Sequence, residues 1–244
     1  MKGASRPAEI ADGVRREIVT GRYRPGERLP SERELADQAG VNRGSAREAL
    51  KILAKERLIE VKPGGARVAP LHQANLDVLG HVLEMPGTPD PALVSQLLDV
   101  HEMLLVGAAR LAVERASPAE LERAGALLDE LMKRGASEAA QFQTLASLLQ
   151  LIAQASQNLV LHMVGNSLHA ILAAVVPLLR RIRPTPRTLA PSIATLREAI
   201  DERNPEKAEA GVRALLRLKR ETLMKELELE ASADPATPRS KTAR

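Results

Sequence analysis

The sequence contains no cysteine and no tryptophan, and only one tyrosine and one phenylalanine among 244 residues. Without cysteine there is no disulfide framework, no thiolate metal site and no cysteine nucleophile. Hydrophobic residues still make up 44% of the chain, so the core must consist of Leu, Ala, Val and Ile, which favours a mainly α protein. No uninterrupted apolar run reaches the ~18 residues of a membrane span, and residues 1–9 lack the apolar segment of a signal peptide. We therefore expect a cytoplasmic protein.

The sequence also lacks common enzyme signatures: it has no phosphate-binding glycine loop, no nucleophile elbow and no HExxH motif. We expect no enzymatic activity and no cofactor. The formal net charge of +4 is unevenly distributed, because residues 1–70 contain 15 Lys and Arg against 10 Asp and Glu, whereas residues 71–244 contain 20 against 21. A basic excess confined to the N-terminal part agrees with binding to the phosphates of a nucleic acid.

Residues 29–50 predict two short helices joined by a tight turn. Ser31 and Glu34 have the spacing of a capping box, in which each side chain binds a free backbone N–H of the other residue. Gly40 suits the left-handed conformation that ends many helices, and Asn42 can cap the second helix. The second helix is therefore expected to begin directly after Asn42.

This second helix presents Arg43 and Arg47, which lie four residues apart and therefore on one face. Its first turn offers Arg, Asn and Ser without a bulky neighbour, which suits the major groove of DNA. The alternative is an ordinary helical hairpin whose arginines are simply solvated. The flanking segments decide between these two interpretations.

A helix is predicted upstream of the pair, over residues 7–20, and we expect its Arg15 and Arg16 to approach the DNA backbone. Downstream, two short strands are predicted around the turn at residues 63–65. Three helices followed by a β-hairpin make a winged helix-turn-helix.

The run from Gly21 to Val68 resembles the N-terminal domain of GntR-type bacterial transcription regulators, because PGERLPSERELA, VNRGSAREAL and the glycine-containing wing occur in this order. The family usually has a glycine where this sequence has Arg57. The resemblance implies that the wing glycine enters the minor groove. It implies DNA contacts at Arg33, Asn42, Arg43, Gly44, Ser45, Arg47 and Gly65.

We divide the chain into a DNA-binding domain at 1–70, a linker at 71–91, an all-helical domain at 92–230 and a disordered tail at 231–244. The tail is polar and contains proline, so it has too few apolar groups to fold. The helical domain is expected to be an antiparallel all-α bundle. Its predicted helices, separated by Pro, Gly or Asn, are 92–115, 118–134, 137–156, 158–183, 188–203 and 205–230.

This helical region resembles the ligand-sensing domain of the FadR branch of the same family, through ARLAVERASPAELERAGALLDEL at 109–131, IAQASQNLVL at 152–161 and REAIDERNPEKAEAGVRALL at 197–216. Many members of that branch hold a metal with one Asp and three His. The corresponding residues here are Leu145, Leu149, Ile193 and Leu215. These side chains have no lone pair for a metal, and residues 137–160 contain neither Asp nor His. We therefore expect no metal site.

Two interpretations of this altered site remain open. Its leucines are either plain core or the wall of an aliphatic pocket that takes an acyl chain or another apolar effector. His101 stands where the family often has an arginine that meets the ligand's carboxylate, although an ordinary helix histidine is the alternative. A basic cluster at Arg180, Arg181, Arg183 and Arg187 could also receive a head group. The expected effector residues are His101, Leu145, Leu149, Ile193 and Leu215.

These features predict a transcription regulator that binds a pseudo-palindromic DNA operator as a homodimer. The resemblance implies repression as the commoner mode of action. An effector in the metal-free apolar pocket, for example a fatty acid or an acyl-CoA, is expected to modulate it. One alternative is a ligand-free dimeric DNA-binding protein whose helical domain serves dimerisation alone. Another is an enzyme with a DNA-binding appendage.

Overall fold

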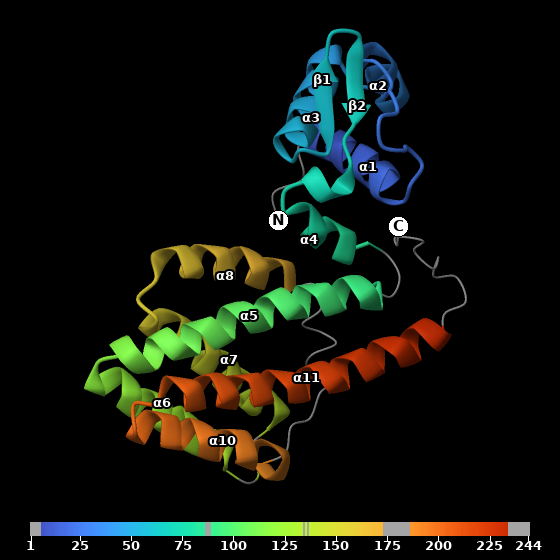
Figure 1. Ribbon diagram of the computed structural model, residues 1–244. Helices are drawn as coiled ribbons and strands as arrows, with labels where there is room; N and C mark the ends of the chain where they lie inside the picture. Colours follow the sequence, from blue (N-terminus) through green and yellow to red (C-terminus); the bar gives the residue numbers. More distant parts are fainter. Residues whose placement is uncertain (1–5, 86–88, 134, 136, 173–185, 234–244) are drawn as a thin grey trace. The chain divides into compact units, whose positions relative to one another are not determined.

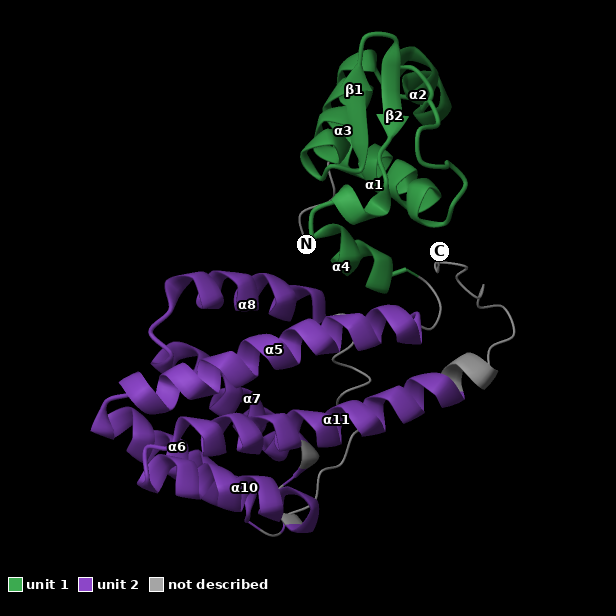
Figure 2. Cartoon of the chain, viewed as in Figure 1, with its two compact units in different colours: residues 1–85 green, residues 86–244 purple. Residues whose placement is uncertain are grey.

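The computed structural model describes residues 6–85, 89–133, 135, 137–172 and 186–233. The chain divides into two compact units, residues 1–85 and residues 86–244 (Figure 2). The first unit combines short helices with a β-hairpin, and the second is helical throughout its described residues (Figure 1).

The first unit is a winged helix-turn-helix, as predicted. Strands β1 and β2 pair antiparallel, with Ile59 opposite Val68 and Lys62 opposite Gly65. The turn between them therefore consists of two residues, Pro63 and Gly64. In chain order, its elements are α1 (Arg6–Val19), α2 (Glu32–Ala39), α3 (Arg43–Lys55), β1 (Ile59–Lys62), β2 (Gly65–Val68), a 3₁₀ turn (Leu71–Gln73) and α4 (Val78–Leu83).

Local capping signals explain where α2 and α3 begin. The Ser31 side chain accepts a hydrogen bond from the Glu34 backbone N–H, and the Glu34 carboxylate accepts one from the Ser31 backbone N–H. Gly40 then ends α2 in the left-handed conformation, with φ of 63°. Asn42 caps α3, so the predicted helix pair is present and both helices begin where the capping residues predict.

A buried ion pair fastens α1 to the end of α3. The Arg15 side chain is 5% exposed, and its guanidinium donates to both carboxylate oxygens of Glu56 at 2.9 and 2.5 Å. It also pairs with Asp12. The expectation that Arg15 approaches the DNA backbone is therefore wrong, because this side chain is committed to the interior of the unit.

The segment expected as a linker from residue 71 instead packs on the first unit as far as Met85. Val78 of α4 is fully buried in the core of this unit. Asn75 fixes the connection, since its side-chain amide donates to the Lys55 carbonyl at 2.9 Å and its backbone N–H donates to the Glu56 carbonyl at 2.9 Å. The segment that we expected to be a linker helix plus loop therefore contains a helix, α4, that Val78 attaches to the core of the first unit.

The second unit is an all-helical bundle, as predicted. Helix α5 lies against both α11 and α7, and α11 also packs against α10. Helices α5 and α11 run in opposite directions (Figure 1). The described helices are α5 (Pro91–Arg115), α6 (Pro118–Leu131), α7 (Glu138–Ala155), α8 (Leu159–Leu172), α10 (Pro186–Asp201) and α11 (Pro205–Ala233).

The helix starts of the second unit also follow local signals. Ser117 and Glu120 form a capping box around Pro118, and Asn204 precedes Pro205 at the start of α11. The helix expected over 158–183 is described only as far as Leu172, and the tail expected from residue 231 lies outside the described residues from 234 onward.

Helix α5 is the one described helix that is long and apolar enough to span a membrane by length and composition. Its apolar residues include Leu105, Val106 and Val113, which belong to the core that the helices of this unit share. Packing within the bundle accounts for these residues, whereas Val100 and Met103 of the same helix are exposed.

Candidate nucleic-acid interface and ligand cavities

The first turn of α3 is held in shape by its cap. The Asn42 side-chain oxygen accepts hydrogen bonds from the Ser45 backbone N–H at 2.9 Å and from the Ser45 hydroxyl at 3.3 Å. A Cβ added to Gly44 would lie 3.1 Å from the same oxygen, which is tighter than nearly all real contacts. Glycine at this position therefore lets the cap close and leaves the end of the helix free of bulk.

Two arginines project from this helix end. Arg43 and Arg47 are exposed, and neither forms an ion pair with any side chain in the described part of the chain. Arg33 on α2 is exposed as well, but its Nε lies 3.8 Å from the Asp37 carboxylate. Free guanidinium groups at the start of a helix can form bidentate hydrogen bonds with a guanine edge or a phosphate.

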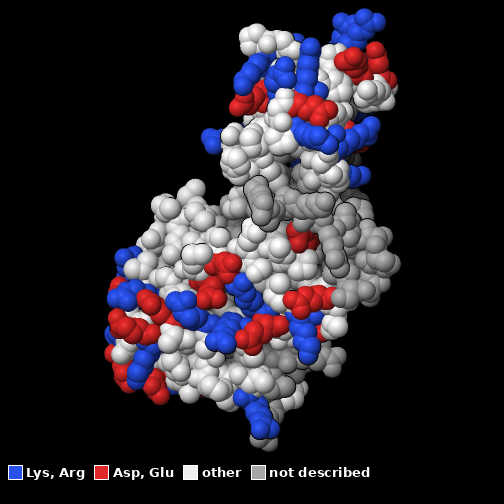
Figure 3. Space-filling view, turned by 45° about the vertical axis from the view of Figure 1, so that its right-hand side comes forward, with Lys and Arg blue, Asp and Glu red and all other residues white. Residues whose placement is uncertain are grey.

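The wing owes its shape to glycines. Gly64 and Gly65 have φ angles of 99° and 120°, in a region that other residues rarely adopt. A Cβ on Gly65 would also lie 3.0 Å from Nε of Arg28, which packs beneath the turn. Arg67 on β2 donates to the Gly26 carbonyl at 2.9 Å. Figure 3 shows Lys and Arg side chains, mixed with acidic ones, on the surface of this unit.

Arg57 lies between α3 and β1 and has a positive φ of 58°. A residue with a Cβ pays about 1–2 kcal/mol for this left-handed conformation. The side chain is exposed. Arg57, at the position where the resemblance implies a glycine, therefore keeps the left-handed backbone conformation and adds strain to it.

In the second unit, the residues that correspond to the metal ligands do not fit a metal. Leu145, Ile193 and Leu215 are buried in the shared core, and Leu149 packs against that core. Hydrocarbon side chains supply no donor atoms. Among the described residues, no group of three or more His, Asp or Glu side chains is arranged to hold a metal ion.

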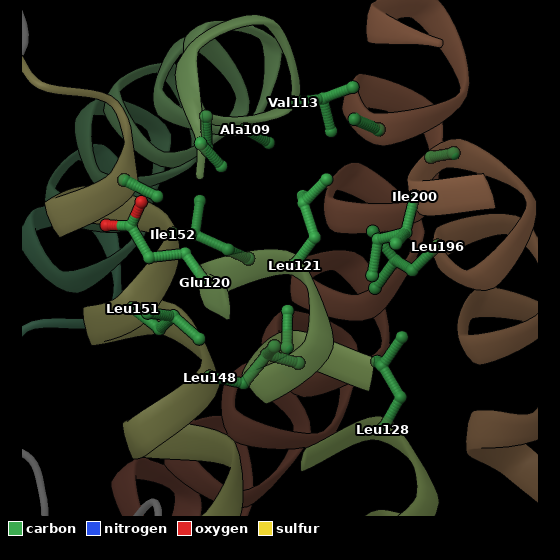
Figure 4. A pocket seen from close by; sticks show the side chains of 16 residues that line it. Ala109, Val113, Glu120, Leu121, Leu128, Leu148, Leu151, Ile152, Leu196 and Ile200 are labelled. Atoms are coloured by element: carbon green, nitrogen blue, oxygen red, sulfur yellow. The ribbon is translucent and has the colours of Figure 1, made fainter. Parts of the chain in front are cut away.

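A first cavity, of about 50 Å³, lies among α5, α6, α7, α10 and α11. Its lining is nearly all aliphatic, and the side chains of Leu121, Leu148 and Ile152 point toward one another across it (Figure 4). Glu120 is the one charged residue in the lining, and its carboxylate already accepts hydrogen bonds from the Ser117 backbone N–H and hydroxyl at 2.8 and 2.7 Å. None of the five expected effector residues lines this cavity.

A second cavity, of about 60 Å³, lies among α5, α7, α8 and α11. It contains two of the expected effector residues, His101 and Leu149, together with a lysine that the sequence interpretation missed. Its lining consists of Leu98, His101, Glu102, Leu149, Leu172, Leu216, Lys219, Arg220 and Leu223.

Two of the three basic groups that line this cavity, His101 and Lys219, have shifted pKa values. Burial lowers the pKa of His101 to about 4, with smaller contributions from Lys219 and His169. Burial alone lowers the pKa of Lys219 to about 8. At neutral pH the imidazole is therefore uncharged, whereas the Lys219 ammonium is still largely protonated.

Most of the expected basic cluster cannot be placed in the site. Arg180, Arg181 and Arg183 lie outside the described residues, and Arg187 is an exposed residue at the start of α10. The signal that could have revealed Lys219 is its spacing on α11. Val212, Leu216, Lys219, Leu223 and Leu227 recur every three or four residues, which places the lysine on an apolar stripe.

Comparisons with known proteins agree with both units. Residues 7–68 match the family described as bacterial regulatory proteins, gntR family, and residues 96–218 match the FCD domain. The galactonate operon transcriptional repressor of Escherichia coli (strain K12) is 33% identical over 164 residues, which cover 66% of this chain and 71% of that protein.

Other relatives match over shorter stretches. The HTH-type transcriptional regulator Mce2R of Mycobacterium tuberculosis (strain CDC 1551 / Oshkosh) is 37% identical over 114 residues, which cover 46% of this chain and about half, 48%, of that protein. The solved structure of Streptococcus agalactiae GntR aligns at 23% identity with a TM-score of 0.44, over 88% of this chain and 99% of that one. The named relatives are transcription regulators. The chain belongs to the GntR family of bacterial regulatory proteins, with a winged helix-turn-helix followed by an FCD domain.

Proposed function

We propose that this protein is a cytoplasmic repressor that binds a pseudo-palindromic operator as a homodimer. The observation that carries the proposal concerns Arg43 and Arg47. Both side chains are exposed and form no ion pair with a described side chain. They lie at the start of a capped helix whose neighbouring residues there are small. Arg33, Asn42, Gly44 and Ser45 would complete the contact with the major groove. Gly65, at the tip of the wing, would enter the minor groove.

The homodimer is supported by an apolar surface on the second unit. Leu159, Val160 and Met163 of α8 are 75%, 69% and 62% exposed. Apolar side chains gathered in this way commonly mark a protein interface, and a two-fold partner would explain a symmetric operator. Replacing Leu159 and Met163 together with lysine should give a monomer in light scattering and weaken operator binding.

The helical domain is proposed to bind an effector whose buried part is aliphatic. The wall of the first cavity is dominated by Leu, Ala, Val and Ile, so a polyhydroxy acid such as galactonate would leave its hydroxyl groups without partners there. The second cavity combines five leucines with His101, Glu102, Lys219 and Arg220. The cavities, at about 50 and 60 Å³, are less than half the size of the ~150 Å³ cavity that holds benzene in another protein. Among fatty acids and acyl-CoA thioesters, short acyl chains therefore fit best.

A ligand-free helical domain is the second candidate, because Leu145, Ile193 and Leu215 fill the core where other members of the family hold a metal. In that case the domain would serve dimerisation alone. A series of short and long acyl compounds that leaves both the melting temperature and operator affinity unchanged would favour this candidate.

The experiment that tests DNA binding is selection of duplexes from a random library by the intact chain, followed by footprinting. The proposal expects an enriched sequence with two inverted half-sites and protection of both. In a reporter assay, the selected sequence placed at a promoter should lower expression when the protein is present. Failure to enrich any sequence at low salt would overturn the proposal, and enrichment of a single unrepeated half-site would overturn the homodimer.

A further inference from the structure

We infer that Arg28 enters the minor groove of the operator beside Gly65 and selects A·T base pairs at the positions beneath the wing. The inference rests on the DNA-binding function proposed above and deepens it. Arg28 is not among the candidate DNA contacts named so far, because it belongs to the segment that precedes α2.

The first observation is that this segment is joined to the wing. Two backbone hydrogen bonds, each of 2.9 Å, connect Glu27 and Leu29 to β2. Between them, Arg28 lies directly opposite Arg67 in an antiparallel pair. A pair of this kind, flanked by hydrogen bonds rather than sharing them, brings its two side chains close together on one face of the sheet.

That face is the outer face of the wing. Side chains alternate between the two faces of a strand, and both Arg28 and Arg67 are exposed. Gly65 stands two residues before Arg67 on β2 and therefore lies on the same face. The residues next to the two arginines are instead buried in the core of the unit: Leu29, Ala66 and Val68.

The second observation is the contact between Arg28 and Gly65. A Cβ added to Gly65 would lie 3.0 Å from Nε, 3.4 Å from Nη2 and 3.5 Å from Cζ of Arg28. The guanidinium group thus covers the space that a side chain at position 65 would need. Wherever the tip of the wing enters a groove, this guanidinium enters with it.

The third observation is that the charge of Arg28 is not compensated within the described part of the first unit. Arg28 forms no ion pair with a described side chain, and like charges directly opposite each other across a sheet are destabilising. Glu60, which lies opposite Arg67 on β1, pairs with Lys62. The Glu27 carboxylate accepts a backbone N–H at 2.8 Å. The outer face therefore presents a positive charge to whatever the wing meets.

The two arginines of this face differ in how free their donors are. Arg67 already donates to the Gly26 carbonyl at 2.9 Å, which ties the segment before α2 more firmly to β2. No described group accepts a hydrogen bond from the Arg28 side chain. Arg28 is therefore the residue that can donate to DNA, and Arg67 supports the strand that carries it.

The properties of DNA decide which sequence such an arginine prefers. A-tracts have a narrow minor groove whose enhanced negative potential attracts inserted arginine side chains. A G·C pair adds the guanine amino group to the floor of the minor groove, whereas A·T pairs present only acceptors there. A guanidinium group has donors and no acceptor, so it favours A·T pairs.

The test compares the intact chain with the variants Arg28→Gln and Lys55→Gln. Arg28→Gln removes the guanidinium and keeps a polar side chain, and its exposed position predicts an unchanged melting temperature. Lys55→Gln is the control, because it removes an exposed charge of the same unit at the opposite end of α3 from Asn42. Operators are first selected from a random library, and affinities are then measured by fluorescence anisotropy at constant salt.

Three duplexes separate the two grooves. They carry A·T, G·C or inosine·C pairs at the enriched positions outside each half-site. Inosine lacks the amino group of guanine, so inosine·C resembles A·T in the minor groove and G·C in the major groove.

The inference expects the original chain to enrich A·T pairs at these positions and to bind the G·C duplex about tenfold more weakly. The inosine·C duplex should bind within about twofold of the A·T duplex. Arg28→Gln should still select the inverted half-sites but should bind all three duplexes alike, at the level of the original chain on G·C. Lys55→Gln should discriminate as the original chain does.

Inosine·C that behaves like G·C would show that the preference is read in the major groove and would overturn the inference. A folded Arg28→Gln protein that keeps the A·T preference would overturn it too, as would an equal loss of affinity for all three duplexes, which indicates a phosphate contact. Failure to enrich any sequence would remove the proposed function itself. Enrichment of inverted half-sites with random flanks would remove the role of Arg28 alone.

Discussion

The candidate functional groups lie on the surface of the first unit but line a cavity in the second. In the first unit, Arg43 and Arg47 stand exposed on a short motif whose cap is complete within four residues. In the second unit, the candidate groups lie inside, on helices that are far apart in the sequence, and His101 and Lys219 meet only because α5 packs on α11. A surface site can thus be formed by a local sequence motif, whereas an interior site depends on the packing of the whole bundle.

The same contrast explains why the two units differ in how far they keep their family's pattern. Leu145, Ile193 and Leu215, which the resemblance aligns with metal ligands, are buried in the core and have hydrocarbon side chains. A bundle tolerates such exchanges as long as volume and apolar pattern are preserved. The fold therefore persists while the chemistry of the interior changes.

The largest effect is expected from the ion pair that fixes α1 to α3. Glu56→Ala leaves the buried Arg15 guanidinium without its main partner and should lower the free energy of unfolding of the first unit by about 3–5 kcal/mol. Urea unfolding, combined with hydrogen exchange of α1 and α3, measures this change.

The matched control is Glu48→Ala, which breaks the exposed pair with Lys51 at 2.9 Å. Its cost should stay below about 1 kcal/mol. Similar small costs for both variants would show that the stability of the first unit does not depend on the pairing of the buried Arg15 guanidinium.

The interior of the second unit should be intolerant of added volume. A Cβ on Gly211 of α11 would lie 2.7 and 2.8 Å from side-chain carbons of Leu196 and 3.2 Å from its backbone nitrogen. Gly211→Ala should therefore destabilise the unit by about 1–3 kcal/mol.

Gly107→Ala on α5 is the control, because no atom lies within 4 Å of the added Cβ. It should stabilise the helix by about 0.5–1 kcal/mol. If Gly211→Ala proved as stable as Gly107→Ala in thermal denaturation, the close packing of α10 on α11 would be refuted.

Acid should weaken the second unit through His101. The unfolded imidazole takes up a proton near pH 6.5, whereas burial lowers the pKa of the folded one to about 4, with Lys219 and His169 contributing. Between these values the unfolded state binds more protons, so stability falls as the pH falls from 6.5 to 4, on the order of 1–2 kcal/mol. The variant His101→Gln should not show this loss of stability in unfolding curves recorded between pH 6.5 and pH 4. An unchanged pH dependence in the variant would contradict the burial of His101.

The smallest effect is expected at Arg57, where strain can be removed from the first unit. Arg57→Gly keeps the positive φ at less cost and should raise stability by about 0.5–1 kcal/mol after allowance for the greater freedom of glycine in the unfolded chain. Arg57→Ala keeps the strain and serves as the control. A loss of stability in the glycine variant would show that the arginine side chain contributes more than its conformation costs.

Much of the fold could be predicted because helix starts carry local signals. The capping boxes at Ser31 and Ser117 and the prolines at the first helical positions are visible within four residues, and the structure has helices at these places. The candidate DNA-binding residues belong to the same class of local pattern. Their positions on α2, on the first turns of α3 and on the wing follow directly from it.

The rest depends on contacts that a local pattern does not contain. In the sequence, Arg15 is one of two adjacent basic residues on a predicted helix. Its burial depends on the ion pair with Glu56, which lies 41 residues away. The attachment of residues 71–85 follows from the apolar core of the first unit, in which Val78 is buried. Lys219 resembles any lysine of an amphipathic helix until α5, α7 and α8 surround it.

The central claim is that Arg43 and Arg47 read the operator, and its most direct test is operator affinity of the double variant Arg43→Ala/Arg47→Ala. Each bidentate contact contributes ~1–3 kcal/mol of discrimination, so affinity for the selected operator should fall at least about 30-fold and its salt dependence should become shallower. Arg123→Ala/Arg187→Ala, which removes two exposed arginines from the second unit, should leave both quantities unchanged. Unchanged operator affinity in a folded Arg43→Ala/Arg47→Ala protein would contradict the claim.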